Sequence, residues 1–288
     1  MYPSRFRYEA PRSLEEAYSL LQTYGDEAKV VAGGQSLIPL MKLRFSAIGV
    51  LIDLNTIPGL AYHHADPDGS IRIGALCRHR DLEYSSVLRS SQPTMSACAP
   101  LISDPMVRSR GTLVGSLCHA DPQGDWASVM LALNGEIIAA SSQGERAIPA
   151  SQFVVGPFQN SLKPGEIAIA ARIPAPTGMV AGGYLKLERR VGDFATVGVA
   201  VALEMSGGTV SRAGIALTGV GASNIKCTAA EQALVGKSLS AGTIEEAARL
   251  AAQAAEPKSD HRGSAKYKRH IVHTFVTRGL SSREARAA

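Results

Sequence analysis

The stretch VVAGGQSLIPLMKLR, residues 30–44, sets two adjacent glycines between an apolar, strand-like run and a short amphipathic segment. Backbone N–H groups at Gly33 and Gly34 would reach a helix N-terminus, where the positive end of the helix dipole favours an anion such as phosphate. Pro39 falls in the first helical turn, where its missing N–H costs little. The stretch lacks the P-loop pattern, and Gln35 stands where G-x-G-x-x-G needs its second glycine. These residues therefore indicate one of two things. The turn binds phosphate without being a P-loop or a G-x-G-x-x-G motif, or it only connects a strand to a helix.

A second glycine-containing stretch, RSRGTLVGSLCHADPQGDWA, covers residues 108–127. Its glycines would let a ligand lie against the main chain, its hydroxyls can donate to phosphate, and its carboxylates can accept from sugar hydroxyls. Together the two stretches could hold the two ends of a dinucleotide. The structural alternative is a pair of glycine-rich β-turns, with Asp-Pro starting another turn. The residues concerned are Gly111, Thr112, Gly115, Ser116, Asp121 and Asp125.

The elements around the first stretch predict a small β-α-β unit. Ser13 is the expected N-cap of a helix, with Glu16 three residues later as its capping-box partner, and this helix should end near Gly25. KVVAGG then predicts a strand, SLIPLMKLR a short helix and GVLIDLNTI a second strand.

From about residue 58 the pattern changes to a mixed α+β arrangement. A Pro-Gly-rich connector after EIAIAARIPAPTG predicts a domain boundary near residue 176. The expected β segments are 70–79, 111–122 and 135–154, and the expected helical segments are 81–102 and 126–135.

The rest of the chain places strand candidates before helices. Residues 182–190, 194–208 and 209–221 predict three strands, and helices should begin near residues 228 and 243. This order predicts an antiparallel three-stranded sheet covered on one face by a helical layer.

Composition excludes several classes of protein. Hydrophobic residues make up 45% of the 288 residues, and the net charge of +5 comes from scattered basic residues matched by 25 acids, which argues against nucleic-acid binding. The four cysteines are widely separated without a C-x-x-C pair, so we expect free thiols in a reducing cytoplasm and no zinc or iron–sulfur ligation in this chain. No apolar run approaches the roughly 18 residues of a membrane span.

Three segments in this order and at these separations resemble the FAD-binding medium subunit of the molybdenum hydroxylases, a group that includes xanthine, carbon monoxide, nicotine and quinoline dehydrogenases. They are VVAGGQSLIPLMKLR, residues 101–137 and YLKLERRVGDFATVGVAV. The likeness covers essentially the whole chain. It implies an α+β fold: a two-subdomain FAD-binding domain of the PCMH/VAO type over residues 1–176, divided near residues 57 and 58, and a C-terminal α+β domain over residues 177–288.

The resemblance also implies the cofactor-binding residues. The first loop would embrace the FAD pyrophosphate, and residues 112–116 would form the opposing clamp. Asp125 matches a position that binds the sugar-like part of the flavin, Ile102 and Ile169 match apolar positions beside the cofactor, and Lys186 matches a polar contact near the flavin ring. The full implied set is Ala32, Gly33, Gly34, Gln35, Ser36, Ile102, Thr112, Leu113, Val114, Gly115, Ser116, Asp125, Ile169 and Lys186.

Two positions depart from the family pattern. Gln35 replaces the His of the more usual AGGHS loop, and both side chains can form hydrogen bonds. Val114 replaces the first of two consecutive glycines, and a β-branched residue would be strained there if the position needs a positive φ.

In the enzymes that the chain resembles, a large subunit holds a molybdenum cofactor and a small subunit relays electrons through two 2Fe-2S clusters. The medium subunit's FAD collects single electrons and passes pairs to an external acceptor, in a complex expected here to be a dimer of heterotrimers. We therefore expect no general acid or base, no metal site and no membrane or nucleic-acid partner in this chain. The alternatives are a self-sufficient flavoprotein oxidase, or a non-catalytic nucleotide-binding assembly subunit.

Some other residues have a functional and a structural interpretation. Phe194 could shield a flavin ring, but the strand pattern favours a core position. His270 and His273 are interpreted as a solvated helix face rather than metal ligands. Cys118 and His119 are adjacent in an expected strand, so their side chains should point apart and not form a nucleophilic pair.

Overall fold

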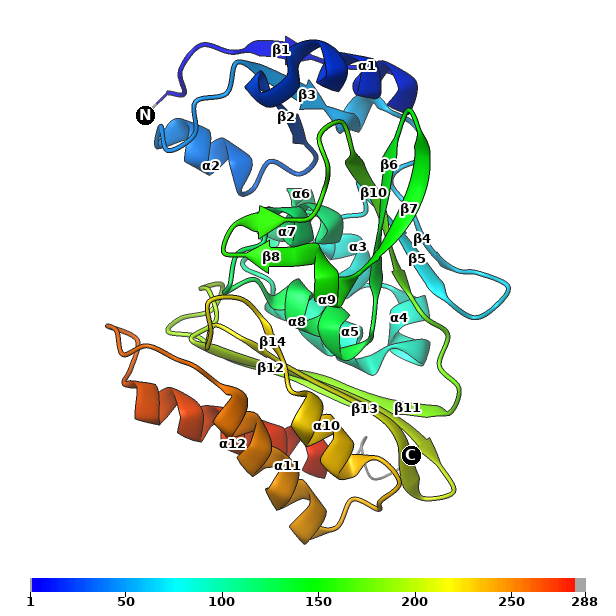
Figure 1. Ribbon diagram of the computed structural model, residues 1–288, viewed down its shortest axis with the longest axis vertical. Helices are drawn as coiled ribbons and strands as arrows, with labels where there is room; N and C mark the ends of the chain where they lie inside the picture. The colour runs from blue at the N-terminus through cyan, green and yellow to red at the C-terminus, as the bar shows by residue number, and fades with distance from the viewer. Residues whose placement is uncertain (1, 283–288) are drawn as a thin grey trace.

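The N-terminal part of the chain is a small parallel sheet with two helices in the computed structural model, which describes residues 2–282 (Figure 1). The Ser13 hydroxyl accepts from the Glu16 N–H, and the helix it caps stops before Gly25, as predicted. β2 and β3 are parallel, which confirms the β-α-β unit, and β1 adds a third strand in the order β1-β3-β2. The elements are β1 (Arg7–Glu9), α1 (Leu14–Tyr24), η1 (Gly25–Glu27), β2 (Ala28–Val31), α2 (Leu37–Lys42), β3 (Val50–Asp53) and η2 (Leu54–Thr56).

The middle of the chain forms a five-stranded antiparallel sheet in the order β4-β5-β10-β6-β7, together with a group of short helices. The strands are β4 (His63–Ala65), β5 (Ile71–Gly74), β6 (Glu136–Ser141), β7 (Gly144–Pro149) and β10 (Ile167–Ile173), with a separate ribbon of β8 (Val154–Gly156) and β9 (Gln159–Asn160). The helices are α3 (His79–Glu83), α4 (Ser86–Ser91), α5 (Pro93–Cys98), η3 (Ala99–Leu101), α6 (Pro105–Arg110), α7 (Leu113–His119), α8 (Asp125–Ala132) and α9 (Ala150–Phe153).

The expectation of a strand over residues 111–122 is wrong, because this segment contains helix α7. The Thr112 side chain accepts a hydrogen bond from the Gly115 N–H at 3.0 Å, which is an N-cap. Leu113, Val114 and Leu117 are buried and share one face of the helix. Helical spacing of three apolar residues, with a capping Thr before them, therefore outweighs the β propensity of the segment.

The C-terminal sheet has four antiparallel strands in the order β11-β12-β13-β14, where three were predicted. The added strand has only two residues and pairs with the end of β13, which is too short for a sequence pattern to reveal. The elements are β11 (Met179–Leu187), β12 (Val197–Ser206), β13 (Thr209–Thr218), β14 (Ile225–Lys226), α10 (Thr228–Leu234), α11 (Ala241–Ala254) and α12 (Ala265–Ser281). None of the helices within residues 2–282 is long and apolar enough to cross a membrane.

Both faces of this sheet are covered (Figure 1). Val199 and Val201 of β12 pack with the helical layer α10–α12, whereas Ala200 and Ala202 belong to the core that contains α5 and α8. A Cβ atom at Gly214 would lie 1.8 Å from the carbonyl oxygen of Ala132 at the end of α8. Small residues therefore let the middle of the chain pack directly on the sheet, and the prediction of one covered face is incomplete.

Candidate cofactor site

The first glycine loop connects β2 to α2 and presents unused backbone donors. Gly34 has φ +73°, a conformation that favours glycine. Among the described residues, no acceptor is found for the backbone N–H groups of residues 33–36. Ser36 occupies the N-cap position of α2, yet its side chain makes no capping hydrogen bond. The loop therefore offers several amide donors at the positive end of a short helix, which suits an anionic ligand.

Close packing between the two predicted loops explains Gly33. A Cβ atom at Gly33 would lie 2.2 Å from the Arg110 carbonyl oxygen and 2.7 Å from the Gly111 Cα atom. No side chain fits in that space. The two loops, far apart in the sequence, are thus in direct main-chain contact.

The second segment is the N-terminus of a buried helix. Thr112, Leu113 and Val114 are each at most 2% exposed. Val114 is helical and is absent from the described non-glycine residues with positive φ, so the strain considered from the sequence does not arise. Within residues 2–282, no backbone acceptor is found for the N–H group of Val114. Both segments therefore present free amides.

The buried His79 ring packs against the start of the second segment at Gly111. The Trp126 Nε1–H donates to His79 Nδ1 at 3.0 Å, and a Cβ atom at Gly111 would lie 2.8 Å from the His79 ring. Burial, followed by the nearby Arg108 and Arg78, lowers the pKa of His79 to about 4. A neutral ring is therefore enclosed beneath the segment at neutral pH.

Asp125 and Lys186, predicted separately, are partners in one buried cluster. The Lys186 Nζ atom donates to Asp125 Oδ2 at 3.0 Å and to the Leu101 carbonyl oxygen at 2.9 Å. The Tyr184 hydroxyl donates to Asp125 Oδ1 at 2.6 Å. Burial raises the pKa of Asp125, while Lys186 and Tyr184 act in the opposite direction. Lys186 also lies 3.4 Å from a Glu188 carboxylate oxygen, so one cation serves two carboxylates.

The remaining predicted residues lie beside these groups. Ile102 belongs to the same core as Leu113 and Val114. Ile169 packs in the cluster that includes Ala32. A Cβ atom at Gly124 would lie 3.9 Å from Ser116 Oγ, which places the start of α8 next to the second segment. The Gln35 side chain turns back on its own loop, where its Nε2 donates to the Gly33 carbonyl oxygen at 3.2 Å.

Two residues that sequence reasoning missed connect the segments. Arg78 Nη1 donates to the Arg110 carbonyl oxygen at 2.6 Å, and Arg78 Nη2 donates to Asn55 Oδ1. Asn55 Nδ2 in turn donates to the Ala32 carbonyl oxygen at 2.7 Å. No sequence signal marks these residues, because each is an isolated polar side chain far from its partners in the chain.

Other interpretations are corrected or refined by the structure. Phe194 is 52% exposed, so its assignment to the core is wrong. Cys118 and His119 lie on helix α7 rather than on a strand, and burial raises the pKa of the Cys118 thiol to about 12. His273 lies 3.0 Å from a Glu245 carboxylate oxygen on the neighbouring helix, a carboxylate that the sequence did not suggest.

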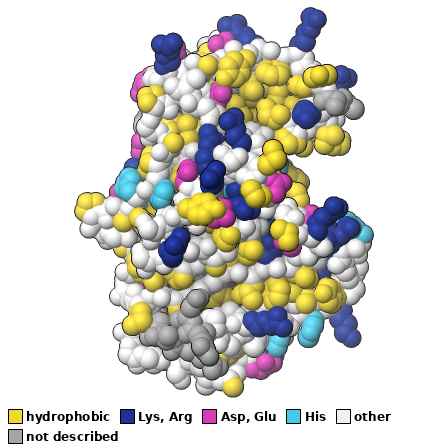
Figure 2. Space-filling view, turned by 180° about the vertical axis from the view of Figure 1, so that it is seen from behind, with side chains coloured by type: hydrophobic (Ala, Val, Ile, Leu, Met, Phe, Trp, Pro, Cys, Tyr) yellow, Lys and Arg dark blue, Asp and Glu magenta, His cyan; other side chains and the backbone are white. Residues whose placement is uncertain are grey.

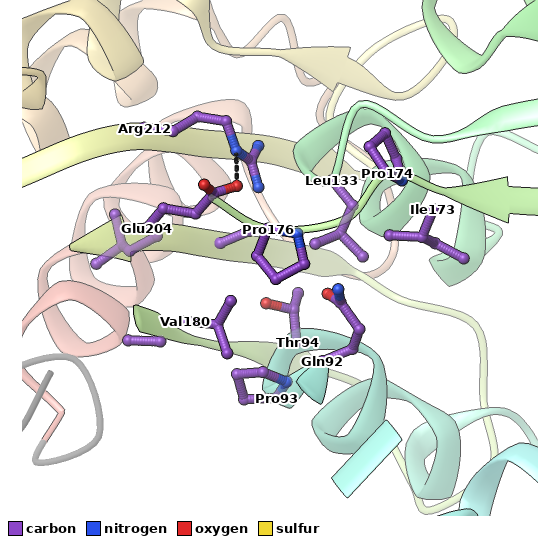
Figure 3. Close-up of a pocket in the computed structure, with 13 residues that line it drawn as sticks. Gln92, Pro93, Thr94, Leu133, Ile173, Pro174, Pro176, Val180, Glu204 and Arg212 are labelled. Carbon is purple, nitrogen blue, oxygen red and sulfur yellow. Dashed lines mark hydrogen bonds and ion pairs between the residues drawn. The ribbon is translucent and has the colours of Figure 1, made fainter. Parts of the chain in front are cut away.

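The cavity in Figure 3 belongs to the contact between the middle of the chain and the C-terminal sheet. Its volume of about 10 Å³ corresponds to one water molecule. Glu204 beside it accepts from the Thr177 N–H at 2.8 Å and pairs with Arg212, which also donates to the Ala132 carbonyl oxygen. Burial alone would raise the pKa of Glu204, but these donors outweigh it and the pKa is lowered. The cavity is too small for a dinucleotide and is a structural junction.

The residues at the two segments fit the diphosphate of FAD. Free amides from two chain segments lie side by side, at the N-termini of α2 and α7, where negative charge is favoured. Seen from behind, the molecule is hollowed at its side below the N-terminal sheet, and Lys and Arg side chains gather beside this hollow (Figure 2). The chemistry of the site is therefore that of an anion-binding cleft made mainly of backbone.

Comparison with known proteins defines the family. Residues 4–176 match the FAD binding domain in molybdopterin dehydrogenase, and residues 183–282 match the CO dehydrogenase flavoprotein C-terminal domain. The chain therefore belongs to the FAD-binding medium subunits of the molybdopterin dehydrogenases, the CO dehydrogenase and xanthine dehydrogenase-like family.

The relatives described here match over 97% or more of their length. The chain is 37% identical over 288 residues to the carbon monoxide dehydrogenase medium chain of Hydrogenophaga pseudoflava, with complete coverage of both. It is 38% identical to the alpha subunit of the 6-hydroxypseudooxynicotine dehydrogenase complex of Paenarthrobacter nicotinovorans, covering 100% of this chain and 97% of the relative. Its fold matches carbon monoxide dehydrogenase from H. pseudoflava with a TM-score of 0.95, at 39% identity and complete coverage of both chains. Quinoline 2-oxidoreductase from Pseudomonas putida 86 matches with a TM-score of 0.91 at 31% identity, covering 100% of this chain and 99% of that one.

Proposed function

We propose that this chain is the electron-transfer subunit of a multisubunit molybdenum-containing hydroxylase or dehydrogenase, taking electrons from a 2Fe-2S subunit and passing them to an external acceptor. The observation that carries the proposal is the direct contact of Gly33 with Arg110 and Gly111, which brings two sets of free backbone amides together. FAD, when bound, supplies the redox chemistry by accepting electrons singly and releasing them in pairs.

The chain's own residues bind and orient the cofactor. The amides of residues 33–36 and of Val114 would hold the diphosphate. Lys186 holds the Asp125 carboxylate in one orientation, in which that carboxylate would accept hydrogen bonds from hydroxyls of the cofactor's sugar-like part. Ile102 and Ile169 would exclude water beside the cofactor. The described residues supply binding and charge, and we assign none of them as a general acid or base.

The proposed assembly contains a large molybdenum-cofactor subunit and a small subunit with two 2Fe-2S clusters, arranged as a dimer of heterotrimers. The names of the relatives describe medium chains or subunits of complexes, which supports the presence of partner subunits. All four cysteines are free, which supports the reducing cytoplasm as the compartment. Separate sheets support a division into residues 1–57, 58–176 and 177–288.

FAD binding by the purified full chain tests the cofactor assignment. We expect a yellow protein whose released flavin is FAD by mass spectrometry. Gly34→Ala should weaken FAD binding because it strains the loop at φ +73°. Gly59→Ala is the matched control, since Gly59 has φ +79° and open space around it but lies outside the loop. A colourless chain that rejects FAD would favour the assembly-subunit alternative.

Native co-purification with metal analysis tests the assembly. We expect two partner chains, molybdenum and iron to accompany this chain. A metal-free homo-oligomer would contradict the proposal, and turnover of an organic substrate by the isolated chain would favour the oxidase alternative.

A further inference from the structure

A continuous chain of hydrogen bonds joins the two diphosphate-binding segments. It runs from the Ala32 carbonyl oxygen to Asn55 Nδ2 at 2.7 Å, from Asn55 Oδ1 to Arg78 Nη2, and from Arg78 Nη1 to the Arg110 carbonyl oxygen at 2.6 Å. We propose that Arg78 and Asn55 are positioning residues that hold the two segments at the separation and orientation FAD requires. This inference rests on the proposed FAD site.

The hydrogen bond from Asn55 to the Ala32 carbonyl oxygen orients the Gly33 N–H towards the proposed diphosphate site. The Ala32 C=O and the Gly33 N–H belong to the same planar trans peptide unit, so they point in opposite directions. Asn55 holds the carbonyl on one side, and the Gly33 N–H is thereby directed to the other side, where it has no partner among the described residues. Hydrogen bonding of the carbonyl also polarises the same amide and strengthens its donor.

The chemistry of the two side chains suits a link between two carbonyl groups. A guanidinium is a planar fork whose two ends donate in different directions at once, whereas a lysine ammonium is a point charge on a flexible stem. An asparagine amide both accepts and donates, so it relays the link from Arg78 to Ala32.

Further hydrogen bonds hold the backbones of Arg78 and Asn55 in place. The Arg78 backbone N–H donates to Asp81 at 2.9 Å, and Arg78 forms an isolated β-bridge with Thr112 of the second segment. The Asn55 backbone N–H donates to Asp53 Oδ1 at 2.9 Å, and the Tyr8 hydroxyl donates to the other oxygen of that carboxylate at 2.7 Å. The link therefore connects two anchored parts of the fold, the N-terminal sheet and the helix α3 region.

Titration of FAD into the flavin-free full chain tests the inference. We expect Arg78→Met and Asn55→Ala each to weaken FAD binding about tenfold, on the order of one charged hydrogen bond. ADP, measured by competition, should be weakened by the same factor because it shares the diphosphate. The double variant should bind about as weakly as either single variant, since one break interrupts the whole link.

Two further variants separate positioning from charge and from stability. Arg78→Lys keeps the charge but not the fork, so affinity should stay low. Arg172→Met is the control: it removes another part-buried arginine, which pairs with Glu136 at 2.8 Å on the central sheet, and it should leave FAD affinity unchanged. Thermal unfolding of each flavin-free variant shows whether it is folded. If Arg78→Met does not fold, Asn55→Ala provides the test, because Asn55 is exposed and its substitution should leave the fold intact.

Each outcome has a separate meaning. A wild-type chain that does not bind FAD contradicts the proposed function itself. Binding by the wild-type chain together with unchanged affinity in the variants overturns only the link. Full recovery by Arg78→Lys, additive losses in the double variant, or a loss for FAD that spares ADP would also overturn it.

Discussion

The first loop and the second segment of the proposed FAD site offer the same donors, free backbone amides, but the chain builds them differently. The first loop is short, contains the positive-φ Gly34 and has an exposed Gln35. The second is the start of a helix whose residues Leu113 and Val114 are buried in the main core. Replacing a glycine should therefore disturb the first loop, whereas removing a buried contact should disturb the second segment.

The difference also explains why valine is acceptable at position 114. A helical residue needs no positive φ, so the Val114 side chain can pack in the core while its N–H, in the first helical turn, has no intrahelical acceptor. Gly33, in contrast, has no space for a side chain against the Arg110 carbonyl. The first loop therefore requires glycine at position 33, whereas the second segment accepts a large apolar residue at position 114, although both have the same proposed binding role.

The largest effect should come from the buried support near the second segment. Lys186→Met leaves the carboxylates of Asp125 and Glu188 without their cation, and we expect a loss of about 3–5 kcal/mol in unfolding free energy. Urea unfolding of the flavin-free chain, followed by fluorescence of the single tryptophan Trp126, measures it. Lys268→Met is the control, because its partner Asp260 is 39% exposed and stays hydrated. Equal losses in the two variants would contradict the comparison.

Acid should destabilise the second segment through His79. Its pKa is lowered to about 4, so the unfolded chain binds a proton below about pH 6.5 while the folded chain does not. This contribution to stability is present above that pH and is lost as the pH falls towards about 4, by about 3 kcal/mol in all. His79→Gln should flatten this part of the urea-midpoint profile, and His270→Gln, at an exposed position of α12, is the control variant. Parallel profiles for wild type and His79→Gln would refute the prediction.

Gly33→Ala should move the first loop away from the second. Overpacking against the Arg110 carbonyl should cost about 1–3 kcal/mol of stability, and FAD affinity should fall at least tenfold because the two sets of amides no longer converge. Calorimetric titration with FAD measures the binding. Gly183→Ala, where a Cβ atom meets nothing within 4 Å, should bind FAD normally. Normal FAD binding by Gly33→Ala would show that the close contact between Gly33 and Arg110 is not required for FAD binding.

The smallest effects should distinguish two helical glycines. Gly242→Ala in α11 meets open space and should stabilise the chain by up to about 1 kcal/mol through helix propensity. Gly115→Ala in α7 should show no such gain, because its Cβ atom would lie 2.8 Å from the capping Thr112 hydroxyl. Thermal unfolding compares the two, and a similar gain at both positions would argue against a special role for that cap.

Local signals in the sequence were sufficient for the first loop and for several elements. Ser13 with Glu16 marked the first helix, and two glycines between apolar runs marked the β2–α2 connection, because caps and turns depend on residues a few positions apart. The same kind of reasoning failed at residues 111–122, where β-forming residues concealed a capped helix, and at Phe194, whose strand-like surroundings concealed an exposed position.

The sequence by itself determined the family, the alternation of strands and helices, the unclustered cysteines and the two glycine segments, since each is encoded by nearby residues or by motifs in order. Only the tertiary structure decided that Gly33 packs on Arg110, that Lys186 pairs with Asp125, and that Arg78 reaches Asn55. These contacts join residues far apart in the chain. Their geometry follows from how sheets and helices pack, a property that no short stretch of residues contains.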